Sequence, residues 1–146
     1  MRYLLILIAF FCFLVSLSVF FTFKAQFNLF YEDRASKKIL TLEDFESQFS
    51  LFPNITATSI PIPAIRAVFA TNEKKFILAD SLLSKADIIN PYIGYSDYVK
   101  SLNYYAFGNI DSSTYYARKA FIKWPKSPDN YKQYLKTLAY VGDTIG

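Results

Sequence analysis

Histidine is absent from this chain of 146 residues, and cysteine and glycine are scarce. Without histidine, the chain lacks the commonest general base and metal ligand of enzymes. The lone cysteine, Cys12, excludes a disulfide within the chain and a cysteine-based metal cluster. The four glycines form neither a G-x-G-x-x-G fingerprint nor a phosphate-binding loop. We therefore expect a protein that is not an enzyme and that uses no cofactor and no metal.

Carboxylates are the remaining residues that could carry acid/base chemistry. Four of them stand in helical segments, where we expect solvated helix faces and helix caps. We therefore predict no catalytic role for Asp80, Asp87, Asp97 and Asp111.

Charge is mild and scattered along the chain. Sixteen Lys and Arg residues stand against 12 Asp and Glu residues, for a net charge of +4. The clustered basic stripe of a nucleic-acid-binding protein is missing, so we expect no nucleic-acid partner.

A long apolar run opens the chain. The uncharged segment Tyr3–Phe23 is 21 residues long, which matches the thickness of a bilayer's hydrocarbon core at about 1.5 Å per helical residue. We predict a transmembrane anchor over residues 1–24, with the lipid bilayer as a partner. The alternative is a signal peptide cleaved near Ser16-Leu17-Ser18, but the apolar run continues beyond that site through Val19, Phe20 and Phe21.

The flanking charges bear on the orientation of this anchor. Arg2 precedes the span, whereas Lys24, Arg34, Lys37 and Lys38 follow it, so a literal positive-inside count puts the C-terminal part in the cytoplasm. Long domains, however, translocate largely regardless of charge. The abundance of Phe, Tyr, Lys, Asn and Ile also suggests an AT-rich bacterial genome. We expect a single-pass protein of the bacterial inner membrane whose C-terminal domain is periplasmic.

Residues 25–60 form the predicted linker, which contains one short helix. Thr41 is the expected N-cap of this helix, with Asp44 three residues later in place of the Glu or Gln of a standard capping box. Proline at positions 61 and 63 keeps the preceding residues extended, so we expect a hinge there.

The C-terminal segment, residues 61–146, repeats itself at a constant interval. Five helices are predicted in it: Pro63–Thr71, Glu73–Ile88, Tyr95–Phe107, Asp111–Lys123 and Asp129–Tyr140. The pairs matched at this interval are Ala79 and Ser113, Leu83 and Ala117, Ala86 and Ala120, Pro91 and Pro125, and Gly108 and Gly142.

This pattern resembles the tetratricopeptide repeat (TPR), a helical repeat whose unit is about 34 residues long, the same as the interval between the matched pairs. The resemblance rests on Tyr98, Ser101, Tyr104, Gly108, Ser113, Ala117, Ala120 and Pro125. It implies an all-α fold, in which a single N-terminal transmembrane helix is followed by a short TPR-like solenoid of helical hairpins with about two and a half repeats. It also implies a scaffold or adaptor that binds a protein or glycan partner in the bacterial envelope.

The whole chain also resembles, more loosely, the C-terminal end of bacterial O-antigen ligase or polymerase membrane proteins. The similar segments are Phe30–Ala35, Phe52–Ile55 and Asn90–Tyr95. Those enzymes have many transmembrane helices, whereas this chain has one, so their activity is not carried over. The alternative function is therefore the C-terminal portion, or a relative, of such an enzyme without its catalytic part. A third alternative is a subunit of a membrane complex.

Two surfaces of the repeat segment are candidate binding sites. The first helix of each TPR pair lines the groove, where we expect a peptide or glycan ligand; by that resemblance the groove residues are Tyr95, Tyr98, Leu102, Tyr105, Lys132 and Lys136. Their alternative role is contact with the adjacent unit. The last predicted helix has no following partner in this sequence, so we expect a protein interface at its open end, at Tyr131, Tyr134, Leu135 and Leu138. We predict packing roles for Tyr104, Tyr115, Phe121 and Trp124.

Overall fold

The computed structural model describes residues 2–36, 41–48, 54–56 and 58–142. Within these ranges the chain is all-helical, with seven helices and no strand. It divides into two compact units, residues 1–58 and 59–146. The first unit contains α1 (Arg2–Ser36) and α2 (Leu42–Gln48), and the second contains α3 (Ile62–Asn72), α4 (Phe76–Ile89), α5 (Tyr95–Phe107), α6 (Ile110–Lys123) and α7 (Pro128–Val141).

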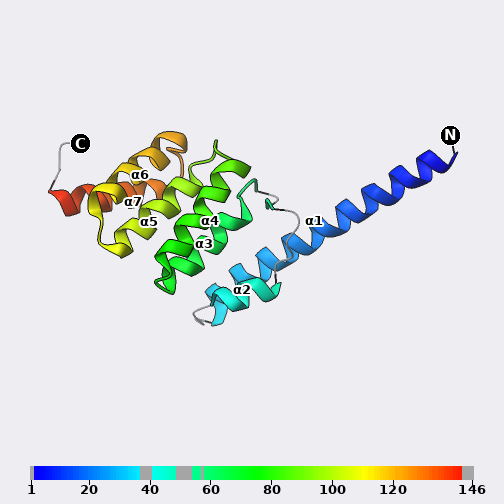
Figure 1. The fold of residues 1–146 in the computed structure, drawn as a ribbon, viewed down its shortest axis with the longest axis horizontal. Coiled ribbons are helices and arrows are strands. Elements are labelled where there is room, and N and C mark those ends of the chain that lie inside the picture. The colour runs from blue at the N-terminus through cyan, green and yellow to red at the C-terminus, as the bar shows by residue number, and fades with distance from the viewer. Residues whose placement is uncertain (1, 37–40, 49–53, 57, 143–146) are drawn as a thin grey trace. The chain divides into compact units, whose positions relative to one another are not determined.

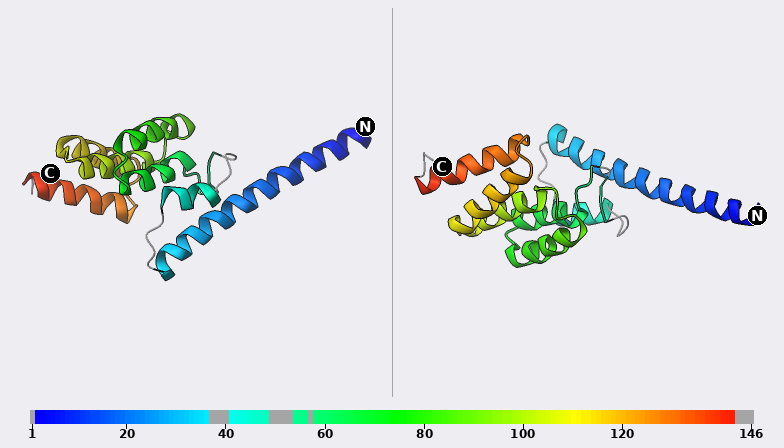
Figure 2. Two further views of the ribbon diagram at one scale, coloured as in Figure 1. Left: turned by 60° about the horizontal axis from the view of Figure 1, so that its bottom comes forward. Right: turned by 90° about the horizontal axis from the view of Figure 1, so that it is seen from above.

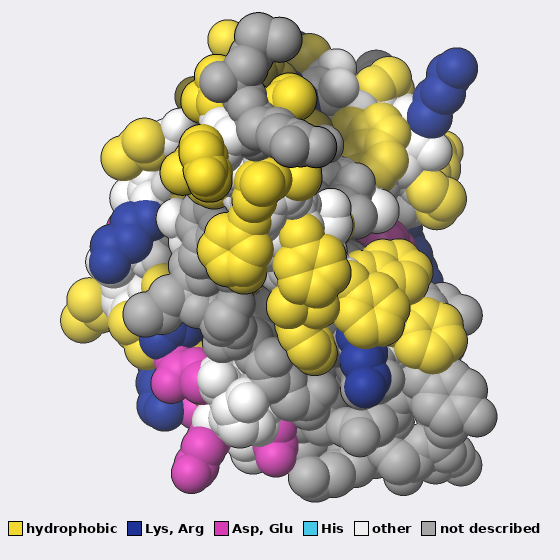
Figure 3. Space-filling model, turned by 90° about the vertical axis from the view of Figure 1, so that its right-hand side faces the viewer, with side chains coloured by type: hydrophobic (Ala, Val, Ile, Leu, Met, Phe, Trp, Pro, Cys, Tyr) yellow, Lys and Arg dark blue, Asp and Glu magenta, His cyan; other side chains and the backbone are white. Residues whose placement is uncertain are grey.

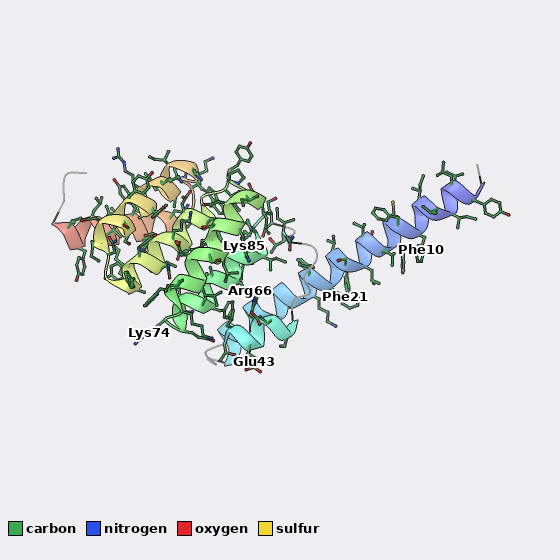
Figure 4. The ribbon with its side chains drawn as sticks, viewed as in Figure 1. Phe10, Phe21, Glu43, Arg66, Lys74 and Lys85 are labelled. Carbon is green, nitrogen blue, oxygen red and sulfur yellow. The ribbon has the colours of Figure 1, made fainter. Side chains whose placement is uncertain are left out.

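Helix α1 carries the apolar run, and its segment Tyr3–Lys24 is long and apolar enough to cross a membrane. The large apolar side chains of this segment are exposed, as Phe10 and Phe21 illustrate in Figure 4. The face of the molecule shown in Figure 3 carries a broad gathering of hydrophobic side chains. The helix continues through Ser36 into the segment predicted as linker, because residues 24–36 contain neither proline nor glycine.

Helix α2 begins as its capping pattern predicts. The Asp44 backbone N–H donates to Thr41 Oγ1 at 3.1 Å, and the Thr41 N–H donates to Asp44 Oδ2 at 2.9 Å. This reciprocal pair is a capping box with Asp in the third helical position. Leu42 and Phe45 of this helix are buried.

The five helices of the second unit form antiparallel neighbours in chain order. Helices α3 and α4 pack against each other, as do α5 and α6, and α7 packs against α6 (Figure 1, Figure 2). Helix α5 also contacts α3 and α7. The residues matched at the repeat interval are buried between these helices: Ala79, Leu83, Ala86, Ser113, Ala117 and Ala120. Small side chains at these places let neighbouring helices approach closely.

Apart from the start of α4, the helix boundaries in this unit match the predicted ones to within one residue. The prediction of an extended segment before Pro63 is wrong at two residues, because α3 already begins at Ile62 and Ser59 has a φ of 63°. Gly108 and Gly142 end α5 and α7 with φ angles of 89° and 73°, the left-handed conformation that glycine adopts without strain. The predicted start of α4 at Glu73 is wrong, because α3 ends in a turn of the same kind around Lys74, whose φ is 59°. The Lys75 N–H closes this turn by donating to the Ala70 carbonyl oxygen at 2.8 Å.

Hydrogen bonds between buried polar side chains join four of the helices. Thr71 Oγ1 of α3 donates to Asn103 Oδ1 of α5 at 3.0 Å. Ser101 Oγ of α5 lies 3.1 Å from Ser113 Oγ of α6 and accepts a hydrogen bond from Gln133 Nε2 of α7 at 3.0 Å. Because unpaired polar groups are costly in a protein interior, these bonds favour one register of the helices.

Asp97 departs from the prediction of a solvated carboxylate. Its side chain is fully buried, and it forms ion pairs with Lys119 Nζ at 3.0 Å and Lys123 Nζ at 2.6 Å, both from α6. Lys123 also donates to the Pro91 carbonyl oxygen at 2.7 Å. The buried carboxylate thus ties α5 to the last turns of α6.

The connection between α4 and α5 lies directly on α6. A Cβ atom built on Gly94 would lie 2.6 Å from the carbonyl oxygen of Ala120, which is closer than such atoms approach in proteins. Glycine at position 94 is therefore required by the close contact of two backbones, not by its own φ of −70°.

Candidate binding groove

Helix α5 presents the predicted groove residues along one face. Tyr95, Tyr98, Leu102 and Tyr105 follow the three- and four-residue spacing of one helical face, and all four are partly buried. The rings of Tyr95 and Tyr98 lie 6.1 Å apart, centroid to centroid. The four residues thus form a continuous aromatic and apolar row.

A pocket of about 350 Å³ lies between α3 and α5 beside this row. Two of the predicted residues, Leu102 and Tyr105, line it. The other lining residues are Val68, Thr71 and Asn72 of α3, Lys74 in the following turn, Phe76 at the start of α4, and Val99 and Ala106 of α5.

Helix α7 brings a positive charge to the same row. Lys136 Nζ lies 4.0 Å from the centroid of the Tyr105 ring, a cation–π geometry. Tyr140 packs edge-on against the same ring, with its centroid 5.9 Å from that of Tyr105. Lys132, one turn earlier on α7, is exposed. The structure therefore joins Tyr105 and Lys136 directly, whereas no such contact is seen for Lys132 within the described residues.

The electrostatic character of the row changes along α5. Burial raises the pKa of Tyr95 to about 12, with smaller contributions from Tyr98 and Asp129. Burial and Asp129 also raise the pKa of Tyr98. At the start of α5 the row therefore carries neutral phenols beside the carboxylate of Asp129. Near the end of α5, Lys74 and Lys136 lie around Tyr105.

The sequence did not predict that α3 would line this pocket. Val68 and Thr71 line the pocket, and they stand one repeat interval before Leu102 and Tyr105. Counting one repeat interval back from Leu102 and Tyr105 identifies both residues. Lys136 stands one interval after Leu102, so Val68, Leu102 and Lys136 occupy equivalent places on α3, α5 and α7.

The second predicted surface, on α7, is partly filled by α6. The Phe121 ring stacks on Tyr134 at 5.6 Å and lies 6.0 Å from Tyr131, centroid to centroid. Tyr131 and Leu135 remain exposed. Leu138, in contrast, keeps only 8% of its surface exposed. It packs inside the unit, so it is not available to a partner in this structure.

The predicted packing residues divide into two groups. Tyr104 stacks on Tyr116 at 5.5 Å, and Phe121 packs as described above. Tyr115 packs edge-on against Tyr116, with ring centroids 5.1 Å apart, but most of its surface is exposed. The prediction is wrong for Trp124, which is exposed.

The raised pKa of Tyr95 predicts a loss of stability in alkali. Its folded-state pKa of about 12 lies above the usual 10.0, so the folded chain holds this proton more tightly than the unfolded chain does. The stabilisation is complete below pH 10 and is lost as the pH rises toward 12. The pKa of Lys119 is also raised, mainly by its hydrogen bond to Asp97, and acts in the same direction. Thermal unfolding followed by circular dichroism should show the midpoint falling from pH 10 upward.

A Tyr95→Phe variant is the control, since it removes the titrating group. Its melting temperature should fall less steeply between pH 10 and pH 12 than that of the parent chain. Equal slopes for the two chains would contradict the assignment to Tyr95.

Among the described residues, no group of three or more His, Cys, Asp or Glu side chains could hold a metal ion. Comparisons with protein-family models, curated proteins and solved structures give no match to this chain.

Proposed function

We propose that this chain is a membrane-anchored scaffold of the TPR type, which binds an extended segment of a protein partner in the bacterial envelope. The observation that carries the proposal is the row on α5, with a pocket between α3 and α5 on one side and Lys136 of α7 over Tyr105. The segment would lie along this row, with α3 and α7 beside it.

The charges along the row favour one direction of binding. Lys74 and Lys136 flank Tyr105, so an acidic part of the partner segment would lie there. Asp129 acts on the phenols of Tyr95 and Tyr98, so a neutral or basic part would lie at the start of α5. Opposite charges placed in this way set the register and orientation of a bound segment more than its affinity.

The TPR assignment is supported by the antiparallel helix neighbours and by the burial of the matched small residues. Helix α5 contacts both α3 and α7, which is the stacking expected when the first helices of successive units lie side by side. In this proposal α1 anchors the chain in the inner membrane, and residues 59–146 lie in the periplasm.

Site-specific photo-crosslinking in cells tests the proposal. A photoreactive phenylalanine analogue at Leu102, inside the row, should give discrete crosslinked products in the membrane fraction that resists carbonate extraction. The Tyr105→Ala change should reduce these products by about fivefold or more, since truncating a central aromatic contact costs about 1 kcal/mol or more. A periplasmic reporter fused after Gly146 should be active.

The matched control places the same analogue at Tyr115, which is exposed on α6. Any crosslinked product from this position should be unchanged by the Tyr105→Ala change. Equal products from both positions, or none from Leu102, would contradict binding in the row. Complete release by carbonate would contradict the membrane anchor while leaving the groove result valid.

A further inference from the structure

Four large, exposed hydrophobic side chains belong to the same end of the helices in the second unit. Ile88 and Tyr92 are each 85% exposed, Ile122 is 66% exposed and Trp124 is 44% exposed. They belong to the last turns of α4 and α6 and to the connections that follow. We call this set the hydrophobic rim. Single exposed hydrophobic residues are common, but a group of this kind at one place indicates a binding surface.

Two contacts hold the parts of the rim together. The Gly94 backbone lies against the Ala120 carbonyl, and Lys123 donates to the Pro91 carbonyl oxygen at 2.7 Å. Tyr92 stands between Pro91 and Gly94 in the chain, so it lies beside the last turn of α6. Ile122 and Trp124 belong to that turn and flank Lys123.

The rim also lies where the chain enters the second unit. Asn90 Nδ2 donates to the Ser59 carbonyl oxygen at 2.9 Å, and Ser59 is the first residue of this unit. The connections after α4 and after α6 are at the same end of the helices, opposite the turn after α3 and the turn after α5 (Figure 1). The chain therefore enters the second unit at the rim.

Positive side chains are in slight excess around the rim. Arg118 and Lys126 are exposed, and Lys123 is partly exposed. Asp97, the nearby carboxylate on α5, is fully buried and already paired with lysines. Asp129 is an exposed carboxylate at the start of α7, so the excess of positive charge is small.

We propose that the hydrophobic rim docks on the lipid headgroup region of the bilayer that α1 spans. Tryptophan and tyrosine favour the membrane–water interface, where an apolar ring body and a polar tip are both satisfied. Lysine and arginine beside them are attracted to anionic headgroups. The inference rests on the proposed membrane anchor, and the tether at Ser59 makes docking on the same bilayer an intramolecular step.

Trp124 is the chain's only tryptophan, so its fluorescence reports on the rim alone. The full chain would be reconstituted in vesicles of phosphatidylcholine with a minority of phosphatidylglycerol. We expect acrylamide to quench Trp124 less in vesicles than in detergent. We also expect phosphatidylcholine with brominated acyl chains to lower its emission, because tryptophan favours the membrane interface.

Paired substitutions supply the controls. Tyr92→Ser with Ile122→Ser removes two exposed anchors of the rim and should restore acrylamide quenching and weaken quenching by brominated lipid. Ile77→Ser with Phe107→Ser changes exposed residues at the opposite end and should leave both measurements unchanged.

Each remaining outcome overturns the inference or its premise. Trp124 that stays open to acrylamide in vesicles would show that the rim faces water. Trp124 that is shielded from acrylamide but not quenched by brominated lipid would show a protein contact instead, such as a second copy. Failure of the chain to float with the vesicles would overturn the membrane anchor itself, a result separate from the other two.

Discussion

Replacing both Lys119 and Lys123 by methionine is expected to destabilise the helical unit by about 3 to 5 kcal/mol, as the loss of the partners of a buried charge does. The carboxylate of Asp97 is fully buried, so water cannot take the place of the two lysines. The side chains of Lys119 and Lys123 are 42% and 26% exposed. Removing Asp97 instead would therefore leave two charges that water can reach. Removing the lysines should therefore cost more than removing Asp97. Thermal or urea unfolding, followed by circular dichroism, measures the difference.

The control restores the balance of charge. Adding Asp97→Asn to the double lysine variant removes the unpaired buried charge and should recover most of the lost stability. The hydrogen bond from Lys123 to Pro91 is not recovered, at a typical cost of about 1 kcal/mol. If the triple variant is no more stable than the double variant, the buried charge is not the cause of the loss.

Replacing Gly94 by alanine is expected to cost about 1 to 3 kcal/mol, the usual range for overpacking an interior. The added Cβ would meet the Ala120 carbonyl oxygen at 2.6 Å, and this atom belongs to a helix backbone that cannot turn aside as a side chain can. Each kcal/mol corresponds to a fall of roughly 4 to 8 °C in melting temperature for a unit of this size. Gly94→Val should be worse than Gly94→Ala.

Gly108→Asn provides the matched glycine control. Gly108 has open space around its Cβ position and a φ of 89°, near the left-handed region that asparagine tolerates better than most residues. Its melting temperature should change less than that of Gly94→Ala. A Gly94→Ala chain with the parent's melting temperature would show that the two backbones lie further apart than the structure places them.

Local signals explain why much of this fold was predictable. The extent of α5, the capping box at Thr41 and the glycine ends at Gly108 and Gly142 each depend on residues within one helix or one turn. The uncharged run in α1 is likewise read from consecutive residues. Such features need no knowledge of what lies across the core.

The features that were missed depend on contacts between distant segments or on an uncommon backbone. The Asp97 carboxylate can be buried because Lys119 and Lys123 of the next helix pair with it. The α5–α6 turn brings these lysines close to it. The late start of α4 follows from a left-handed lysine at position 74, where sequence patterns favour glycine or asparagine. Within the candidate site, the α5 residues and Lys136 of α7 followed from the repeat register. The pocket-lining residues of α3 could be predicted only by extending the repeat register into the first unit, which matches the repeat weakly.

The side-chain hydrogen bonds between helices have a consequence for building longer arrays from this chain. Ser101 is hydrogen-bonded to both Ser113 of α6 and Gln133 of α7, and Asn103 is hydrogen-bonded to Thr71 of α3. One repeat interval earlier, Ala67 and Phe69 stand at the places of Ser101 and Asn103. Their side chains cannot form such hydrogen bonds. The helical pairs are therefore similar in outline but not interchangeable. A duplicated or transplanted pair would keep its shape only if its bonding partners on both neighbouring helices were copied with it.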